Sequence, residues 1–275
     1  MTSYKGPQAA YFGHPKSASS WLAGYMMRTT KVQGKKFWQG QLTLTRFRVE
    51  DILAQKPEVI ITQNSELKKC QQLKFEKAFH VIRDPRDIIV SSYFSYAGTH
   101  DTEGWSELLE LRRELEDKPI EYCIERMIYF NERDVNFMKN WDYNQANVLE
   151  LKYEDMIQNM TKYLTKVMEY LGWLKNDESP LQGPIHFYNR VGYTKNFLWL
   201  PKIRNHAVSE SFVQNLNDEI NIEKLKRKKP SSKNHYRKGK SGDWKNYFND
   251  RHRSIFRELY GDILIDLGYE EGHSW

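Results

Sequence analysis

Cysteines and long apolar runs are both scarce in this sequence. Two of its 275 residues, Cys70 and Cys123, are cysteines, so neither a disulfide framework nor a metal-ligand spacing of cysteines is present. No stretch approaches the ~20 apolar residues that a membrane-spanning helix needs. The first residues, MTSYKGPQ, lack the charged and then apolar leader of a secreted protein. We therefore expect a soluble, cytoplasmic protein with no membrane partner.

Positive charge is distributed unevenly along the chain. The formal net charge is +6, but residues 224–240 hold nine Lys and Arg residues and no acidic residue. Without these nine, 33 basic residues face 36 acidic ones. A nucleic-acid-binding face, a solvated loop and a lid over a polyanionic small ligand are all compatible with such a run. A nucleic-acid face usually interleaves aromatic and basic residues, and this run contains one tyrosine, Tyr236.

Short apolar runs alternate with helical patterns. We predict strands at 9–13, 58–62, 77–82 and 147–151. The helical patterns lie between them and after them, at 18–30, 48–55, 65–73, 85–97, 103–116, 119–140, 154–171 and 250–267. This alternation predicts an α/β fold, a three-layer sandwich with a central parallel sheet. We expect one domain spanning 1–275, in which 174–249 forms long functional loops.

Residues 14–21, HPKSASSW, connect a predicted strand to a predicted helix. Small residues at such a junction leave backbone N–H groups facing outward, and with Lys16 they form a potential anion site. Ligands bind at the carboxyl ends of the strands in parallel sheets, which is where this loop lies. A capped turn that merely buries Lys16 is the alternative.

A second junction, HVIRDPRDIIVSSYF, has the same logic. Asp84 suits a helix N-cap, and the proline after it suits the first helical position. Arg83 therefore projects from a strand end next to a helix start, and Ser91 lies about two turns further on. The alternatives are a surface ion pair of Arg83 with Asp84 or Asp87, and a helix-packing role for Ser91.

A third segment, RKGKSGDWKNYF, starts at Arg237. Arg237 and Lys238 can bind a phosphate, and the neighbouring glycines, Gly239 and Gly242, would let the backbone come close to a partner. Three separated anion-binding elements indicate a ligand with phosphates at two ends.

These motifs, in this order, closely resemble those of the PAPS-dependent sulfotransferase family, where PAPS is 3′-phosphoadenosine 5′-phosphosulfate. PKSASSW at 15–21 is similar to the PKSGTTW loop, which in the family binds the 5′-phosphosulfate. RDPRD with VSSY, at 83–93, resembles the 3′-phosphate element. RKGKSGDWK at 237–245 resembles the segment that closes over the nucleotide, and LKYEDM at 151–156 resembles the YEDM turn. The resemblance spans most of the chain.

The resemblance implies a P-loop-like PAPS site that requires no metal. It implies that Lys16 stabilises the charge developing on the leaving phosphate during a loose, in-line sulfuryl transfer. Trp21, Tyr153 and Phe187 are implied to contact adenine, with core packing as the alternative for the first two. The residues implied to bind PAPS are Lys16, Ser17, Ala18, Ser19, Ser20, Trp21, Arg83, Ser91, Tyr153, Phe187, Arg237, Lys238 and Gly239. Ala18 stands where the family has glycine, so we expect a negative φ there.

The acceptor side departs from the family pattern. Gln63 stands near the expected general-base histidine and Ile61 near the lysine before it, and a glutamine cannot take a proton at neutral pH. His100 is the best titratable substitute as a catalytic base, with an exposed loop histidine as the alternative. His14 and His80 look structural.

We therefore predict a sulfotransferase that moves a sulfuryl group from PAPS to a hydroxyl or nitrogen of a small-molecule acceptor. A P-loop kinase would need a GxxxxGK[ST] loop with Mg²⁺-binding acids, and HPKSASSW lacks that spacing. A nucleic-acid-binding protein that uses 224–240 is the rival outside the enzymes. The family's dimerisation pattern is not evident at 247–256, so the sequence predicts no oligomeric state, and it names no acceptor.

Overall fold

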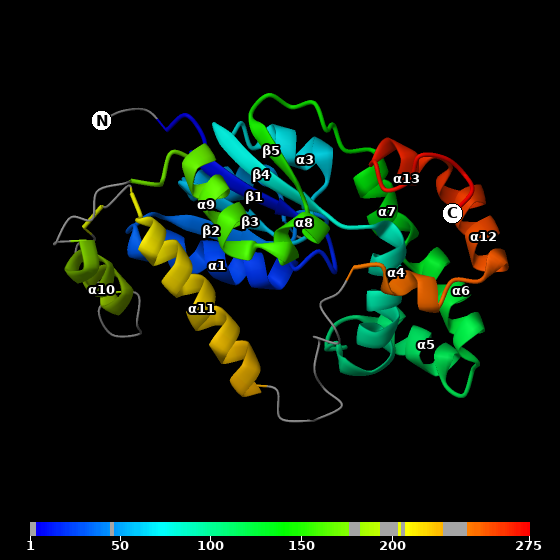
Figure 1. The fold of residues 1–275 in the computed structure, drawn as a ribbon. Coiled ribbons are helices and arrows are strands. Elements are labelled where there is room, and N and C mark those ends of the chain that lie inside the picture. The colour runs from blue at the N-terminus through cyan, green and yellow to red at the C-terminus, as the bar shows by residue number, and fades with distance from the viewer. Residues whose placement is uncertain (1–3, 45–46, 176–181, 193–202, 205–206, 228–240) are drawn as a thin grey trace. The chain divides into compact units, whose positions relative to one another are not determined.

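The computed structural model (Figure 1) describes residues 4–44, 47–175, 182–192, 203–204, 207–227 and 241–275. The chain divides into two compact units. Unit 1 comprises Met1–Ile82 and Asp142–Leu225, and unit 2 comprises Arg83–Trp141 and Lys226–Trp275. One domain spanning the whole chain stays a prediction. Among the described residues, no helix is both long enough and apolar enough to cross a membrane.

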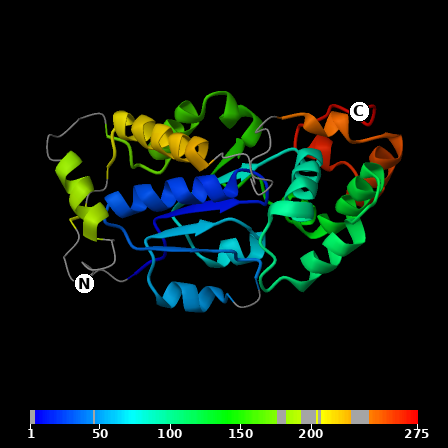
Figure 2. The ribbon, with the colours of Figure 1, turned by 90° about the horizontal axis from the view of Figure 1, so that it is seen from below.

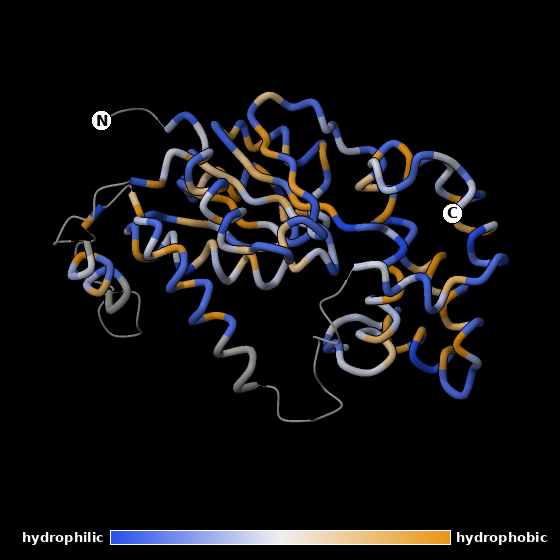
Figure 3. The backbone as a smooth tube through the Cα atoms, viewed as in Figure 1, coloured by the Kyte–Doolittle hydropathy of each residue, from blue (hydrophilic) through white to orange (hydrophobic). Residues whose placement is uncertain are grey.

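A five-stranded sheet forms the centre of unit 1, in the order β2-β3-β1-β4-β5. The strands are β1 (Ala9–Gly13), β2 (Phe37–Gly40), β3 (Val59–Thr62), β4 (Lys77–Ile82) and β5 (Val148–Lys152). Every neighbouring pair is parallel. Helices flank this sheet, which confirms the predicted α/β fold class. Figure 3 shows that the strands carry much of the apolar sequence of this unit, as a sheet covered on both faces requires.

Side chains alternate between the two faces of this sheet. On one face Tyr11 lies beside Ile61 and Phe79, and all three belong to a buried cluster with residues of the covering helices. Those helices are α1 (Ser19–Val32), α8 (Tyr153–Gln158), α9 (Met160–Tyr170) and α11 (Glu210–Arg227). The helices α2 (Val49–Ala54) and α3 (Leu67–Gln72) lie on the other side of the strands (Figure 2). There the ring of Phe12 meets that of Phe75 edge-on, with centroids 5.0 Å apart.

Unit 2 is helical in its described part. It contains α4 (Pro85–Phe94), a π-helical turn η1 (Ser95–Thr99), α5 (Ser106–Leu115), α6 (Ile120–Phe130), α7 (Glu132–Lys139), a 3₁₀ turn η2 (Asp243–Asn246), α12 (Asp250–Tyr260) and α13 (Ile263–Asp266). Its core includes Ile124 and Met127 of α6 and Phe256 and Tyr260 of α12, all with no exposed surface. The hydroxyl of Tyr260 donates to the carbonyl of Ile128, which ties α12 to α6.

The structure departs from the expected elements in several places, among them the helices predicted at 154–171 and 250–267, each of which is two helices. Strand β2 was not predicted, because it is a four-residue edge strand with only Trp38 buried. The tract 174–249 is not all loop: it contains α10 (Gln182–Gly192) and α11. The polar Asn217 lies buried on α11 and donates to Thr161 Oγ1 at 3.1 Å, which interrupts the apolar pattern of that helix. The helix predicted at 119–140 is two helices that meet at Asn131, whose amide group donates to the carbonyl of Met127.

Candidate active site

The loop that joins β1 to α1 in unit 1 holds two residues in the left-handed backbone region. Lys16 has a φ of 62°, and Ala18 has a φ of 57° and a ψ of 21°. The negative φ expected at Ala18 is therefore wrong, because the loop takes the glycine-like conformation despite the Cβ atom. This conformation costs a residue with a Cβ about 1–2 kcal/mol, so the surrounding structure must hold it in place.

The first turn of α1 carries neither an acidic residue nor a side-chain cap. Ala18 is the N-cap residue, and its methyl group cannot accept a hydrogen bond from the helix amides. Lys16 is half-buried beside this turn, Ser19 is buried and Ser20 is exposed. Ser17 Oγ is buried and has no hydrogen-bond partner in the part of the chain that the structure describes. Amides, an ammonium group and hydroxyls at a helix N-terminus are the chemistry of an anion site.

Trp21 and Tyr153 are core residues of unit 1. Their exposed fractions are 4% and 7%, and both belong to the buried cluster under the sheet face that α1 covers. The ring of Trp21 stacks on that of Tyr25, with centroids 5.8 Å apart and an interplanar angle of 10°. Both side chains therefore pack in the core, and their contact with adenine stays a prediction.

Gln63 follows β3 and contacts the start of α1. Its Nε2 atom donates to Ser20 Oγ at 3.0 Å. The residue that stands near the family's histidine thus lies beside the 15–21 loop, with its amide hydrogen-bonded to a hydroxyl of that loop. This contact between a strand end and a helix start could not be predicted from either segment alone.

A buried polar chain runs from β5 through β4 to the residue before the loop. His80 Nδ1 lies 2.6 Å from Glu150 Oε2, and His80 Nε2 lies 2.8 Å from His14 Nε2. Burial lowers the pKa of His80 to about 3 and the pKa of His14 well below its usual value. Two neutral imidazoles satisfy these contacts when His80 donates to Glu150 and accepts from His14. Both rings are fully buried, as expected of structural histidines.

In unit 2, Arg83 directly precedes the first turn of α4. Asp84 is the N-cap, and its Oδ1 accepts from the Arg86 amide at 2.9 Å, which confirms the predicted helix start. Arg83 Nη2 lies 3.8 Å from Asp87 Oδ2, and the side chains of these two residues are 10% and 0% exposed. The ion pair named as an alternative thus exists, but it is buried rather than on the surface. Ser91 is half-buried further along α4.

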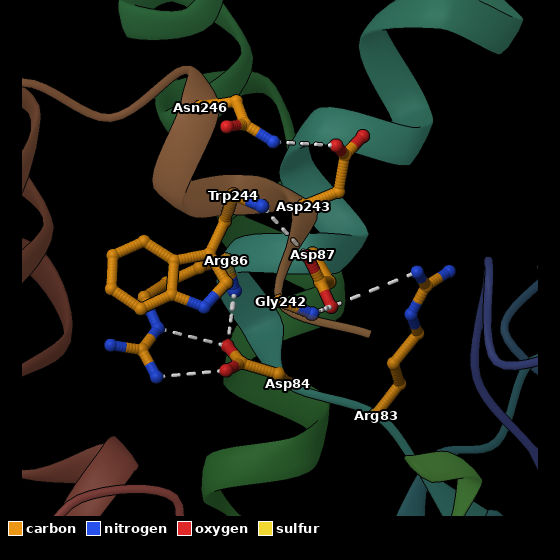
Figure 4. A network of polar contacts seen from close by, with 8 residues as sticks. All are labelled: Arg83, Asp84, Arg86, Asp87, Gly242, Asp243, Trp244 and Asn246. Atoms are coloured by element: carbon orange, nitrogen blue, oxygen red, sulfur yellow. Dashed lines mark hydrogen bonds and ion pairs between the residues drawn. The ribbon is translucent and has the colours of Figure 1, made fainter. Parts of the chain in front are cut away.

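Asp87 also binds the turn that starts η2. Its Oδ2 accepts from the Gly242 amide at 2.7 Å and its Oδ1 accepts from the Trp244 amide at 3.0 Å (Figure 4). Burial raises the pKa of Asp87, whereas Arg83 and the two amides lower it. Gly242 has a φ of 79°, a backbone angle that favours glycine, and a Cβ there would meet no described atom of the chain within 4 Å. The expected close approach of this glycine to a partner stays a prediction.

Arg86 is a buried structural residue that the sequence did not reveal. Its guanidinium forms two hydrogen bonds with Asp84, at 3.0 and 2.8 Å, and an ion pair with Glu270 at 2.6 Å. It also lies over the rings of Trp244, at 3.7 Å, and Trp275, at 4.6 Å. These contacts fix the start of α4 against η2 and the last residues of the chain.

His100 follows the π-helical turn η1 in unit 2. Its ring meets those of Tyr96 and Trp105 edge-on, with centroids 5.1 and 5.5 Å away, and it is half-buried. Its amide donates to the Ser95 carbonyl at 2.8 Å, and its own carbonyl accepts from Arg112. His100 is thus fixed by ring contacts and backbone hydrogen bonds within an aromatic cluster, and it is not an exposed loop histidine. Its catalytic role stays a prediction.

Four expected site residues remain to be placed. Phe187 lies on α10 and is 70% exposed. Arg237, Lys238 and Gly239 lie outside the described residues. Within unit 1 the structure thus places Gln63 against the 15–21 loop, and within unit 2 it places Arg83 and the Gly242 turn on the carboxylate of Asp87.

Comparison with known proteins adds independent information. A family model described as the sulfotransferase domain matches residues 15–268. Sulfotransferase 2A1 of Homo sapiens is 23% identical over 199 residues, 70% of this chain and 58% of its own length. The 3-alpha-hydroxysteroid sulfotransferase of Cavia porcellus is 26% identical over 197 residues, 68% of this chain and 56% of its own length. The matches thus span 56–58% of the length of these two curated relatives.

A solved structure shares the fold. The crystal structure of a mouse sulfotransferase complexed with PAP matches with a TM-score of 0.51 and 20% identity, covering 98% of this chain and 88% of the other. The family match does not favour the kinase alternative. Because one family model spans nearly the whole chain, and because the sequence motifs lie within it, the chain belongs to the sulfotransferase domain family.

Proposed function

We propose that the protein transfers a sulfuryl group from PAPS to a hydroxyl or nitrogen of a small molecule. The observation that carries this proposal is the start of α1, where Lys16 lies beside a helix N-terminus with no side-chain cap and no first-turn acid. The family match supports the reaction type, and the names of two relatives, a hydroxysteroid and a flavonol sulfotransferase, support small hydroxyl-bearing acceptors.

The residues at the start of α1 fit the 5′ end of PAPS. PAPS supplies, when bound, a sulfuryl group attached to a phosphate leaving group. The first amides of α1 and the hydroxyls of Ser17, Ser19 and Ser20 would hold that phosphate. The buried Ser17 Oγ, which has no partner among the described residues, suits such a ligand. The Lys16 ammonium would stabilise the negative charge that grows on the leaving oxygen.

The 3′-phosphate is assigned to the second motif. Arg83 can bind a phosphate dianion with a guanidinium fork, and Ser91 on α4 can add a hydroxyl donor. Arg237, Lys238 and Gly239 are assigned to the same nucleotide from their motif alone. Arg83, Arg237 and Lys238 would neutralise the 3′-phosphate, and Lys16 would neutralise the 5′ end of the ligand. With these cations no metal would be needed.

Adenine and the acceptor proton are assigned to the remaining residues. Trp21 and Tyr153 would contact adenine along their edges, since their faces pack in the core, and Phe187 would provide an exposed ring. Gln63 can orient an acceptor but cannot deprotonate it. His100, held in its aromatic cluster, is therefore the proposed general base.

The compartment is also a proposal. Cys70 and Cys123 are buried free thiols, which suits a reducing cytosol.

Ligand-dependent thermal stability tests the donor assignment. PAP, the desulfated product of PAPS, should raise the Tm of the protein, and the shift should grow with PAP concentration because the ligand binds the folded state. ATP with Mg²⁺ is the matched control for a kinase. A shift with ATP and Mg²⁺ but not with PAP would refute the proposed function. Incubation with ³⁵S-labelled PAPS and pooled metabolites would then identify the acceptor.

A further inference from the structure

Asp87 is the one side chain in Figure 4 that connects Arg83 to the turn at Gly242. Its carboxylate is fully buried. Oδ2 lies 3.8 Å from Arg83 Nη2 and accepts from the Gly242 amide at 2.7 Å, while Oδ1 accepts from the Trp244 amide at 3.0 Å. The turn and the arginine therefore share one oxygen atom.

This arrangement gives the Arg83 guanidinium a buried carboxylate partner. A long arginine side chain has many rotamers, and ordering it costs conformational entropy. The buried Asp87 carboxylate is itself held by two amides, so it gives the guanidinium a fixed partner. A guanidinium has five N–H donors, so it can bind one carboxylate and one phosphate at the same time.

We propose that Asp87 is a positioning residue for recognition of a 3′-phosphate. It directs Arg83 toward this phosphate and anchors the Gly242–Trp244 turn on α4. Ligands that carry a 3′-phosphate should therefore depend on Asp87, and ligands that lack it should not. This inference rests on the proposed function, because it takes Arg83 as the ligand of the 3′-phosphate.

Asp84 provides a matched control three residues earlier. It is also a buried carboxylate at the start of α4, 5% exposed, and it also binds a guanidinium, while it accepts from one backbone amide where Asp87 accepts from two. Its guanidinium partner at 2.8 Å is Arg86 rather than Arg83. A purely structural effect of losing a buried carboxylate should therefore appear in both variants, whereas an effect through Arg83 should appear only at Asp87.

The test compares two ligands that differ only in the 3′-phosphate. Calorimetry measures the Kd of AMP and the Kd of PAP for wild type, Asp87→Asn and Asp84→Asn. The readout is the Kd of AMP divided by the Kd of PAP, which is large when the protein prefers the ligand with the 3′-phosphate. The ratio should fall about tenfold or more in Asp87→Asn, as expected when a charge-assisted contact is misdirected. It should stay within about twofold of wild type in Asp84→Asn. In an Arg83→Ala background, Asp87→Asn should change the ratio no further.

A wild-type ratio near one would overturn the proposed function and this inference with it. A high wild-type ratio that Asp87→Asn preserves, or that Asp84→Asn lowers equally, would overturn this inference alone. So would a further fall on adding Asp87→Asn to Arg83→Ala. If Asp87→Asn does not fold, Asp87→Glu decides instead, because it keeps the charge but displaces it by one methylene. The ratio should then fall, and an unchanged ratio contradicts the inference.

Discussion

Replacing Ala18 with glycine should stabilise the protein, although alanine-to-glycine changes in helices usually destabilise it. Ala18 has a φ of 57° and a ψ of 21°, where a Cβ atom crowds the following carbonyl. That crowding costs about 1–2 kcal/mol, and glycine has no Cβ. Glycine also gains conformational entropy in the unfolded chain, which offsets about 0.4–1 kcal/mol of the gain. The free energy of unfolding should therefore rise by about 0.5–1 kcal/mol.

Ala54→Gly is the matched control for this change. Ala54 is an exposed residue at the end of α2 in the same unit, where its conformation is helical. Glycine there should lower the free energy of unfolding by about 0.5–1 kcal/mol.

Thermal unfolding followed by circular dichroism measures both variants. A change of this size corresponds to a Tm shift of about 1–4 °C, upward for Ala18→Gly and downward for Ala54→Gly. If Ala18→Gly lowers the Tm as much as the control does, Ala18 does not adopt the left-handed conformation. The backbone strain inferred for the 15–21 loop is then refuted.

Other perturbations test the ligand and proton assignments. Lys16→Ala should lower kcat about 10²-fold or more while the Kd of PAP changes little, and a loss confined to affinity would make Lys16 a ground-state phosphate ligand. Arg83→Ala should weaken PAP binding by about 2 kcal/mol or more in calorimetry and leave AMP binding nearly unchanged, whereas equal losses would show a structural role. His100→Ala should lower kcat about 10²-fold and remove the acidic limb of the pH–rate profile, and a rate close to wild type would exclude His100 as the base. Burial lowers the pKa of His80 from 6.5 to about 3, so the folded state binds fewer protons there than the unfolded state between these pH values. The free energy of unfolding should therefore fall by up to ~1.4 kcal/mol per pH unit below pH 6.5, and denaturant titrations of His80→Gln should show a shallower slope than wild type.

Local patterns in the sequence were sufficient for the fold class and for the positions of both strand-to-helix junctions. The capping of α4 by Asp84 involves residues two positions apart, so short-range propensities predict it directly. Elements without a clear local pattern were missed. The edge strand β2 is short and mostly not buried, and α11 buries a polar residue, Asn217, where an apolar one would mark the helix.

The contacts that build the site depend on the path of the chain instead. Asp87 and the Gly242 amide lie 155 positions apart, and Gln63 and Ser20 lie 43 apart. Which distant partners meet depends on strand order and helix packing, because no local propensity records a contact between remote segments. The same holds for Ala18, whose left-handed angle opposes its intrinsic preference and persists because the surrounding structure outweighs about 1–2 kcal/mol of strain. Residue types at the junctions thus indicate which ligand chemistry is present. Tertiary packing decides which distant side chains contact and position the ligand-binding residues.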